Sequence, residues 1–479
     1  MFKLFAKISL FSTLFSLPFA GISVGVESSI QSLDFSGNGP LFLSDNQIQE
    51  DLHQAERLLQ DNYVRYPLLE KAGVSWQSAF KKLADKMLTR VNPTLTHHFQ
   101  KQLIKSLEFT EDSNLQADLF LNKRHYVQRI EPKVAFYSGI RMAQQQERFR
   151  VLPSLKQPKN IVNHWFIDCK TTQEVFFPVL PERQSELLFM LGQQANHQLQ
   201  SLDCTFENDS AVKQQILLPL IMSEAELNRP EMPVYEYKVG RTPYVRWYRD
   251  GKPEEIAVKQ FQKLARKLQT TRTLIIDVRG NRNGSFAFIE KWLKEFTSNH
   301  WKNVIVRERQ TLPVLKGLLN RVQWNLHHST PRLLIGQHQL EQKRMQLQAL
   351  INHFRDKGID EKWVETKFIF NGQNNAPKWN TRLIVIANQH CGNGCQFLAA
   401  LTRQIPNGIL IGTNTGPFPK NISGPIYQLK HSSIMLSFSH RIHLDHRRKP
   451  VSPSGYLPDY WLFPPMGLTD ILRFASKSN

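Results

Sequence analysis

IVIANQHCGNGCQF, residues 384–397, is the segment that says most about the fold of this chain. It begins as an apolar, β-branched run typical of a buried strand, turns at glycines between Cys391 and Cys395, and continues as an apolar helix. Many enzymes hold a nucleophile on such a strand, turn and helix, because amides of the turn can stabilise an oxyanion. The residue at the top of this turn is Asn393.

The same alternation of strands and helices extends from about residue 236 to 475. The predicted strands are TPYVRWYR (242–249), RTLIIDVRG (272–280), KNVIVRE (302–308), TRLIVIANQ (381–389) and GILIGTN (408–414). The predicted helices are 253–269, 285–297, 396–405 and a long insertion at 337–358 that ends on Gly358. This pattern predicts an α/β domain with a largely parallel sheet, whose ligand site lies at the carboxyl ends of the strands. The turns 277–285 and 388–396 both lie at such ends.

Two regions precede this domain. Residues 24–124 are predicted to be a helical N-terminal region, with a capping box of Ser44 and Gln47 at its first helix and Ser75 capping a second. Residues 125–235 contain short apolar runs with β-branched and aromatic residues between turns, which predict a mostly β module.

The first 23 residues have the features of a secretory signal peptide. Lys3 and Lys7 precede an apolar core at 8–19, and small residues follow at a suitable cleavage distance. The core is too short to span a bilayer, which disfavours the alternative of a retained anchor. We therefore expect a periplasmic or secreted protein with no membrane span after signal cleavage.

The chain is basic, with 61 lysines and arginines against 41 acidic residues among 479 and a formal net charge of +20. Such a charge is compatible with an anionic partner, for example an acidic polymer of the cell envelope. The densest basic cluster, SHRIHLDHRRKP (439–450), lacks the aromatic interleaving that favours stacking on bases, so no nucleic-acid partner is expected.

Export favours disulfides for the four cysteines. Three pairings are open, and locality favours Cys391 with Cys395 and Cys169 with Cys204. A zinc site is the alternative, but the cysteines lack a second pair at metal spacing. His440, His443 and His446 step by three in an apparent strand, where that spacing alternates faces. We expect no metal and no cofactor.

Several segments, taken in order, resemble the tail-specific, or C-terminal processing, serine peptidases and their tricorn-like relatives. They are PYVRWY (243–248), LIIDVRGNRNGS (274–285), IVIANQHCGNGCQF (384–397), NGILIGTNTG (407–416) and GYLPDYWL (455–462). The resemblance implies an α/β serine peptidase domain that acts, in exported compartments, on unfolded protein or C-terminal polypeptide segments.

The resemblance also implies roles for particular residues. The amide of Gly394 and that of Gly284, in a glycine turn that here contains Arg282 and Asn283, would form the oxyanion hole. The nucleophilic serine is replaced by Asn393, whose amide cannot be deprotonated to a useful nucleophile.

The base of such a peptidase would be a histidine or a lysine. The chain offers His125 upstream, with Lys123 where some relatives have an aspartate, and Lys420 downstream. Gln396 stands where related exported members have glutamate.

Three functions remain open at this point. The first is a degenerate peptidase that binds polypeptide without cleaving it, which the loss of the serine favours. The second is an active serine-type peptidase with unconventional catalytic residues. The third is a basic envelope-binding protein, which rests on charge alone.

Overall fold

A computed structural model describes most of the chain. The described residues are 33, 39–88, 93–122, 124–131, 133–153, 159–170, 174–181, 186–195, 200–222, 234–239, 242–247, 255–281, 286–298, 305–328, 334–367, 378, 380–392, 394–405, 407–416, 424–445, 447–452, 455–463 and 466–476. The predicted signal peptide, residues 1–23, lies outside them.

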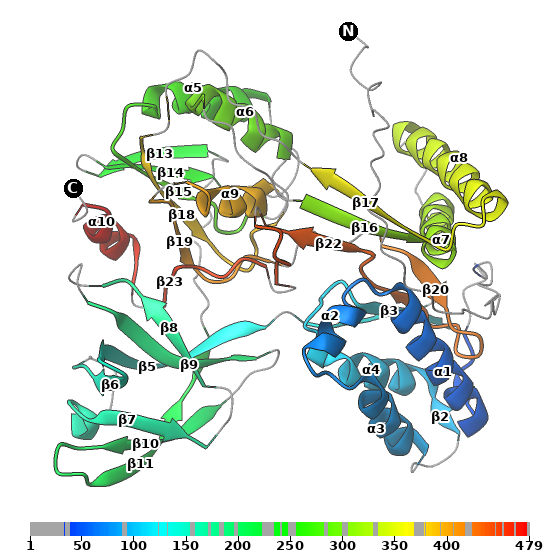
Figure 1. Ribbon diagram of the computed structural model, residues 1–479, viewed down its shortest axis with the longest axis horizontal. Helices are drawn as coiled ribbons and strands as arrows, with labels where there is room; N and C mark the ends of the chain where they lie inside the picture. Colours follow the sequence, from blue (N-terminus) through cyan, green and yellow to red (C-terminus); the bar gives the residue numbers. More distant parts are fainter. Residues whose placement is uncertain are drawn as a thin grey trace.

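A mostly parallel sheet forms the centre of the C-terminal part of the chain (Figure 1). Its strands, in spatial order from one edge, are β13 (Val234–Val239), β14 (Thr242–Trp247), β15 (Thr273–Asp277), β18 (Arg382–Ala387), β19 (Ile409–Gly412) and β23 (Tyr460–Trp461). Every neighbouring pair is parallel except β13 with β14. The prediction of an α/β domain with a largely parallel sheet is confirmed.

Helices cover both faces of this sheet because its strands are apolar on both sides. One face packs on three helices: α5 (Glu255–Leu268), α6 (Phe286–Phe296) and α9 (Gly394–Thr402). The other face packs on α10 (Leu468–Ser476). In β15, Leu274 and Ile276 face the first layer and Ile275 faces the second, as the alternation of a strand requires.

The predicted β module continues the same sheet. Its strands are β5 (Val134–Gln145), β6 (Arg148–Val151), β7 (Trp165–Cys169), β8 (Glu174–Val179), β9 (Leu188–Ala195), β10 (Ser201–Glu207), β11 (Lys213–Pro219) and β12 (Ile221–Met222), with a 3-10 turn at Lys159–Ile161. They pair antiparallel with one another, and β8 meets β23 at Val179 and Trp461 to make one sheet of 14 strands. The module is therefore joined to the α/β domain edge to edge.

The N-terminal region contains α1 (Asp45–Asn62), α2 (Tyr66–Lys71), α3 (Trp76–Leu88), α4 (Thr96–Ser106), a 3-10 turn at Glu108–Thr110 and the short strands β1 (Phe42–Leu43) and β2 (Thr94–Leu95). The capping box of Ser44 and Gln47 is present, and the Ser75 hydroxyl accepts from the amide of Ser78. Both predicted caps are confirmed.

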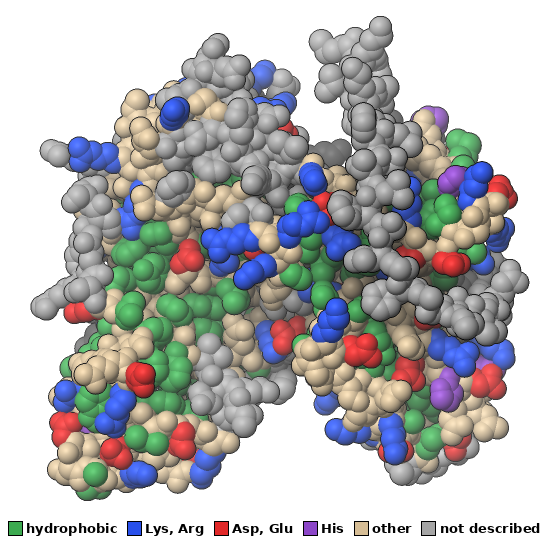
Figure 2. Space-filling model, in the orientation of Figure 1, with side chains coloured by type: hydrophobic (Ala, Val, Ile, Leu, Met, Phe, Trp, Pro, Cys, Tyr) green, Lys and Arg blue, Asp and Glu red, His purple; other side chains and the backbone are tan. Residues whose placement is uncertain are grey.

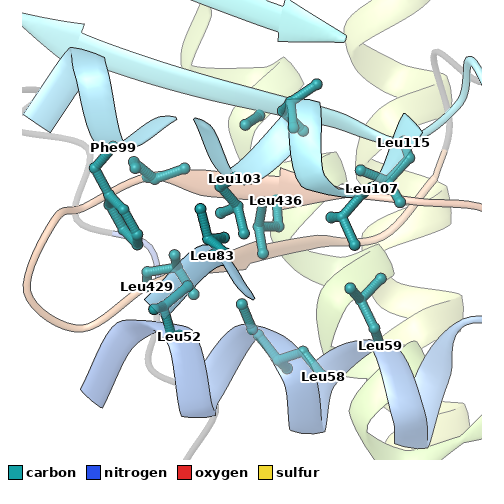
Figure 3. Close-up of a cluster of buried hydrophobic side chains, with 14 of the residues drawn as sticks. Leu52, Leu58, Leu59, Leu83, Phe99, Leu103, Leu107, Leu115, Leu429 and Leu436 are labelled. Atoms are coloured by element: carbon teal, nitrogen blue, oxygen red, sulfur yellow. The ribbon is translucent and has the colours of Figure 1, made fainter. Parts of the chain in front are cut away.

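This helical region shares its core with the C-terminal part of the chain. A sheet of order β20 (Ile426–Gln428), β21 (Met435–Ser437), β3 (Gln116–Leu121) and β4 (Arg124–Arg129) lies against its helices. Leu429 and Leu436 pack among Leu52, Leu83 and other apolar side chains of α1, α3 and α4 (Figure 3). The hairpin β3–β4 also crosses the predicted boundary between residues 124 and 125.

The strand predicted at 302–308 forms, but outside the parallel sheet. As β16 (Ile305–Thr311) it pairs antiparallel with β17 (Glu361–Lys367) and β22 (Arg441–Leu444). Three consecutive charged residues, Arg307, Glu308 and Arg309, lie in its middle, and its inner positions are half buried, so neither of its faces is a closed apolar core. Two helices, α7 (Leu312–His328) and α8 (Leu334–Asp356), lie between β16 and β17 in the chain and pack on each other, and Gly358 follows α8 with φ +58° as predicted.

Candidate active-site turn

The two turns singled out by sequence meet at one edge of the sheet. Strands β15 and β18 are parallel neighbours in which Asp277 lies opposite Ile386. The amide of Gly280 donates to Oδ1 of Asn388 at 2.9 Å, and the amide of Gly392 donates to the carbonyl of Asn281 at 3.0 Å. These bonds hold the turn after β15 against the turn after β18.

A buried ion pair fixes the start of the first turn. The Asp277 side chain is fully buried and receives two hydrogen bonds from the Arg279 guanidinium, at 3.0 and 2.8 Å, and one from the Tyr244 hydroxyl at 2.7 Å. Burial alone would raise the pKa of Asp277, but the charge and hydrogen bonds of Arg279 together with the Tyr244 bond lower it. The carboxylate is therefore ionised and serves to shape the turn.

A third loop closes on the second turn from the side of β19. The amide of Gly416 donates to the carbonyl of Cys391 at 3.0 Å, and Nε2 of Gln396 donates to the carbonyl of Gly416. A Cβ atom on Gly416 would lie 2.7 Å from the carbonyl oxygen of Gln389, so the close approach requires glycine. Gln396 thus acts as a neutral donor that holds this loop.

The segment GYLPDYWL supports the same loop. The amide of Tyr456 donates to the Thr415 hydroxyl at 2.8 Å, and the amide of Thr415 donates to the carbonyl of Tyr456 at 2.9 Å. The segments NGILIGTNTG and GYLPDYWL therefore meet beside the turn that follows β18.

The turn itself is closed by a disulfide between Cys391 and Cys395, both fully buried. Gly394, a predicted oxyanion residue, is the buried first residue of α9. The positive end of the helix dipole lies here, which is compatible with stabilising an oxyanion. Asn393, at the nucleophile position, and Gly284, the second predicted oxyanion residue, lie outside the described residues.

The predicted bases do not complete the site in the part of the chain that is described. Lys420 lies outside that part. His125 lies on β4, where Nε2 is 2.8 Å from Oδ1 of Asp118 and the ring stacks on Phe120. Strand β4 pairs with β3. Figure 1 shows β3 beside the helices of the N-terminal region and α9 over the parallel sheet, so His125 and the turn at 391–395 belong to different parts of the molecule.

The second disulfide joins Cys169 and Cys204, which face each other across β7 and β10. Both expected pairings are therefore present. The disulfide in the β module lies in that module's own apolar core, and only Cys391–Cys395 belongs to the candidate site.

The histidines of SHRIHLDHRRKP are not arranged for a metal. The predicted single strand is divided: β21 ends at Ser437 and β22 begins at Arg441, in different sheets. His440 and His443 are both buried, and His446 lies outside the described residues. No group of described side chains is suited to hold a metal ion.

Two cations of this basic cluster lie beside carboxylates. On the face drawn in Figure 2, lysines and arginines gather over β22 and the strands beside it. In the cluster 439–450, Arg448 pairs with Glu365 at 2.7 Å and Arg441 pairs with Glu308 at 2.8 Å. These ion pairs reduce the charge that the surface offers to a polyanion.

Sequence reasoning missed the residues that join the turns. Asn388 directly follows the buried strand, and its side chain also accepts from the amide of His390 at 3.2 Å. Oδ1 of Asn281 and Oε1 of Gln396 are buried and have no hydrogen-bond partner among the described residues. An asparagine at the end of a buried apolar run was the available signal, because such a side chain commonly bonds to the backbone of the turn it begins.

Comparison with known proteins agrees with this arrangement. Residues 244–461 match the model of Peptidase family S41. No curated protein matches the chain.

Solved structures similar to the chain include mature CPAF, with 14% identity, 91% of this chain and 95% of that chain covered, and a TM-score of 0.43. A putative peptidase from Parabacteroides merdae ATCC 43184 has 12% identity, coverage of 91% and 94%, and a TM-score of 0.43. The photosystem II D1 C-terminal processing protease has 11% identity, coverage of 90% and 96%, and a TM-score of 0.34.

The match to the S41 family model covers the strands and turns of the candidate site, so the chain is similar to this family over residues 244–461. The resemblance to tail-specific peptidases is thereby confirmed. Among the described residues, no helix is long and apolar enough to cross a membrane.

Proposed function

We propose that this protein is an exported, degenerate S41 peptidase that binds polypeptide segments and does not cleave them. The observation that carries the proposal is Asn393, which stands in the sequence where the family has its serine, between the two cysteines of the turn. The framework around that position is retained: the joined turns, the buried Asp277 and the loop at Gly416 all support it. A carboxamide forms no acyl-enzyme by this route.

A serine-reactive fluorophosphonate probe tests the loss of chemistry. We expect no labelling of the purified mature protein and no cleavage of an unfolded, carboxymethylated protein substrate. We also expect saturable binding of a fluorescent unstructured peptide by anisotropy. Cleavage that disappears in Asn393→Ala would contradict the proposal and favour the active peptidase.

The variant Asn393→Ser asks whether the remaining site is competent. If the oxyanion donors and a base are intact, this variant gains probe labelling well above that of the wild type. The matched control is Asn352→Ser on the exposed surface of α8, which should gain none. Absence of peptide binding by the wild type would remove the binding part of the proposal.

Export is supported by the N-terminal sequence and by the two disulfides. We expect the mature chain in the periplasmic or secreted fraction, with an N-terminus near residue 24 by sequencing. A full-length chain retained in the cytoplasm, with reduced cysteines, would argue against it. The alternative of a basic polymer-binding protein has less support, because its densest cluster contains paired cations.

A further inference from the structure

Strand β17 forms an open edge of its sheet. Figure 1 shows β22, β16 and β17 side by side with β17 outermost, and no described strand pairs with β17 on its other side. The sequence of β17 is EKWVETK, Glu361–Lys367, and none of its residues is buried. Such an edge offers its free N–H and C=O groups to another chain.

The pairing of β16 shows which backbone groups of β17 are free. The amide of Arg309 donates to the carbonyl of His440 at 3.0 Å, on the side of β22. Successive residues of a strand direct their N–H and C=O groups to opposite sides, so Glu308 directs its groups to β17, where its partner is Val364. The backbone groups of Val364 are therefore used inside the sheet. Those that point outward belong to Glu361, Trp363, Glu365 and Lys367.

The charges along this edge are self-complementary. Glu361 and Lys367 are the first and last residues of β17, at equal distances in sequence from Val364. In an antiparallel pair of β17 strands centred on Val364, Glu361 of each copy lies opposite Lys367 of the other. The nearest other registers that keep the outward groups opposite one another place Glu361 opposite Glu365, or Glu365 opposite its own counterpart. Since like charges disfavour a cross-strand pair, the charges select the register centred on Val364.

The lysines of the strand do not oppose this pairing. Lysines on an edge strand commonly keep other chains away. In the register centred on Val364, Lys367 meets a carboxylate and Lys362 meets Thr366 of the other copy. Neither lysine meets a like charge.

The remaining carboxylate, Glu365, is compensated by arginines of its own chain. It lies opposite Trp363 of the other copy in this register, and Arg448 donates to it at 2.7 Å. The guanidinium of Arg307 lies 4.7 Å from the centre of the Trp363 ring and 4.0 Å from the Glu365 carboxylate. The middle of the edge therefore adds no unpaired negative charge to the contact.

We propose that two copies of this protein associate through β17, antiparallel and centred on Val364, so that their two three-stranded sheets become continuous. The association is independent of the peptide binding proposed above. Val364 meets its own counterpart in a non-hydrogen-bonded pair, and the outward groups on either side of it supply the hydrogen bonds. Because one strand of each chain forms the contact, the dimer is expected to dissociate on dilution.

Sedimentation equilibrium of the full mature chain at several concentrations tests the association. We expect a reversible equilibrium between monomer and dimer. Glu361→Lys and Lys367→Glu should each weaken the dimer about tenfold, because two cross-strand pairs then hold like charges. The matched control is Lys82→Glu on the exposed surface of α3, which should leave the equilibrium unchanged.

Mixing the two weakened variants tests the register. In a dimer of Glu361→Lys with Lys367→Glu, each opposed pair again contains one carboxylate and one ammonium group. The mixture should therefore associate with an affinity near that of the wild type. Glu361 also pairs with Arg309 at 3.3 Å within its own chain, but damage from losing that contact would not be reversed by mixing.

An engineered crosslink tests the centre of the contact. All four cysteines of the chain are in disulfides, so an introduced thiol is the only free one. A non-hydrogen-bonded pair brings its Cα atoms to about 4.5 Å, which a disulfide can span, so Val364→Cys should crosslink two copies under mild oxidation. Thr366→Cys, on the same face of β17, is the matched control and should not, because it lies opposite Lys362 of the other copy.

A monomer at every concentration would overturn the proposal, as would a dimer that neither charge reversal weakens. Equal crosslinking of Val364→Cys and Thr366→Cys would contradict the register. If the chain stays monomeric and binds an unstructured peptide in a way that Glu361→Lys abolishes, the edge takes a peptide and the proposal is wrong. Circular dichroism shows which variants are folded, and the crosslinking of Val364→Cys decides if neither charge reversal folds.

Discussion

Arg279→Ala is expected to lower the free energy of unfolding by about 3–5 kcal/mol, the range measured when one partner of a buried ion pair is removed. Arg279 has 14% of its side chain exposed and Asp277 has none. Without the guanidinium, the Asp277 carboxylate keeps the Tyr244 hydroxyl and the backbone amide of residue 279 as donors. Urea denaturation of the wild type and the variant at pH 7 measures the loss.

Two comparison variants make this result specific. Arg344→Ala removes a guanidinium that pairs with Glu341 on the surface of α8, which should cost at most about 1 kcal/mol. Arg279→Lys keeps the charge but loses the bidentate geometry, and should fall between the alanine variant and the wild type. If Arg279→Ala costs no more than Arg344→Ala, the buried ion pair does not stabilise the turn.

The parallel sheet was predictable because its strands contain their own signal. Leu274–Ile276 and Leu383–Ile386 are continuous apolar runs. Such runs are typical of a strand that is buried on both faces. The placement of β16 was not predictable in the same way. Its run of charged residues, Arg307 to Arg309, is compatible with any half-exposed strand, and its partners β17 and β22 are distant in sequence.

The shared core of the N-terminal region shows a similar limit. The amphipathic pattern of α1 and α3 specifies that an apolar face must be covered, and the capping residues specify where each helix begins. Nothing in that pattern specifies that Leu429 and Leu436, more than 300 residues away, supply part of the cover. Such long-range closure depends on the whole topology.

In the candidate site, too, local features could be predicted from the sequence and long-range contacts could not. The turn at 391–395 and its disulfide could be predicted, because short-range spacing and glycines determine a tight turn. The role of Asn388 as a link to Gly280 depends on two strands being neighbours, which a single sequence does not state. His125 was chosen by its place in the chain, whereas in the structure it pairs with Asp118 within the sheet of β3 and β4, which is not the sheet that precedes the candidate turn.

Lowering the pH is expected to destabilise the protein through two buried histidines. Burial, followed by the charge of Arg441, lowers the pKa of His440 to about 3, with Glu308 opposing and Lys343 adding to the shift. Neither ring nitrogen of His440 has a hydrogen-bond partner among the described residues, and Oε1 of Glu308 lies 3.9 Å from Nε2.

The direction of the pH dependence follows from these pKa values. Burial and the charges of Arg65 and Arg441 lower the pKa of His443 to the same value of about 3. Both folded-state pKa values lie below the unfolded value of about 6.5, so the unfolded chain binds more protons between pH 6.5 and 3. The contribution is fully present above pH 6.5 and is lost as the pH falls toward 3, at up to about 1.4 kcal/mol per pH unit for each histidine.

Urea denaturation at several pH values between 7 and 4 measures this dependence, and substitution separates the histidines from the carboxylates that also titrate in acid. His440→Gln and His443→Gln remove one titrating group each, so each should flatten the slope of unfolding free energy against pH even where it lowers stability at pH 7. His53→Gln on the exposed surface of α1 is the matched control and should keep the wild-type slope. A variant with both substitutions, His440→Gln and His443→Gln, removes both groups. If its slope of unfolding free energy against pH equals that of the wild type, the two buried imidazoles are not the groups that take up protons on unfolding.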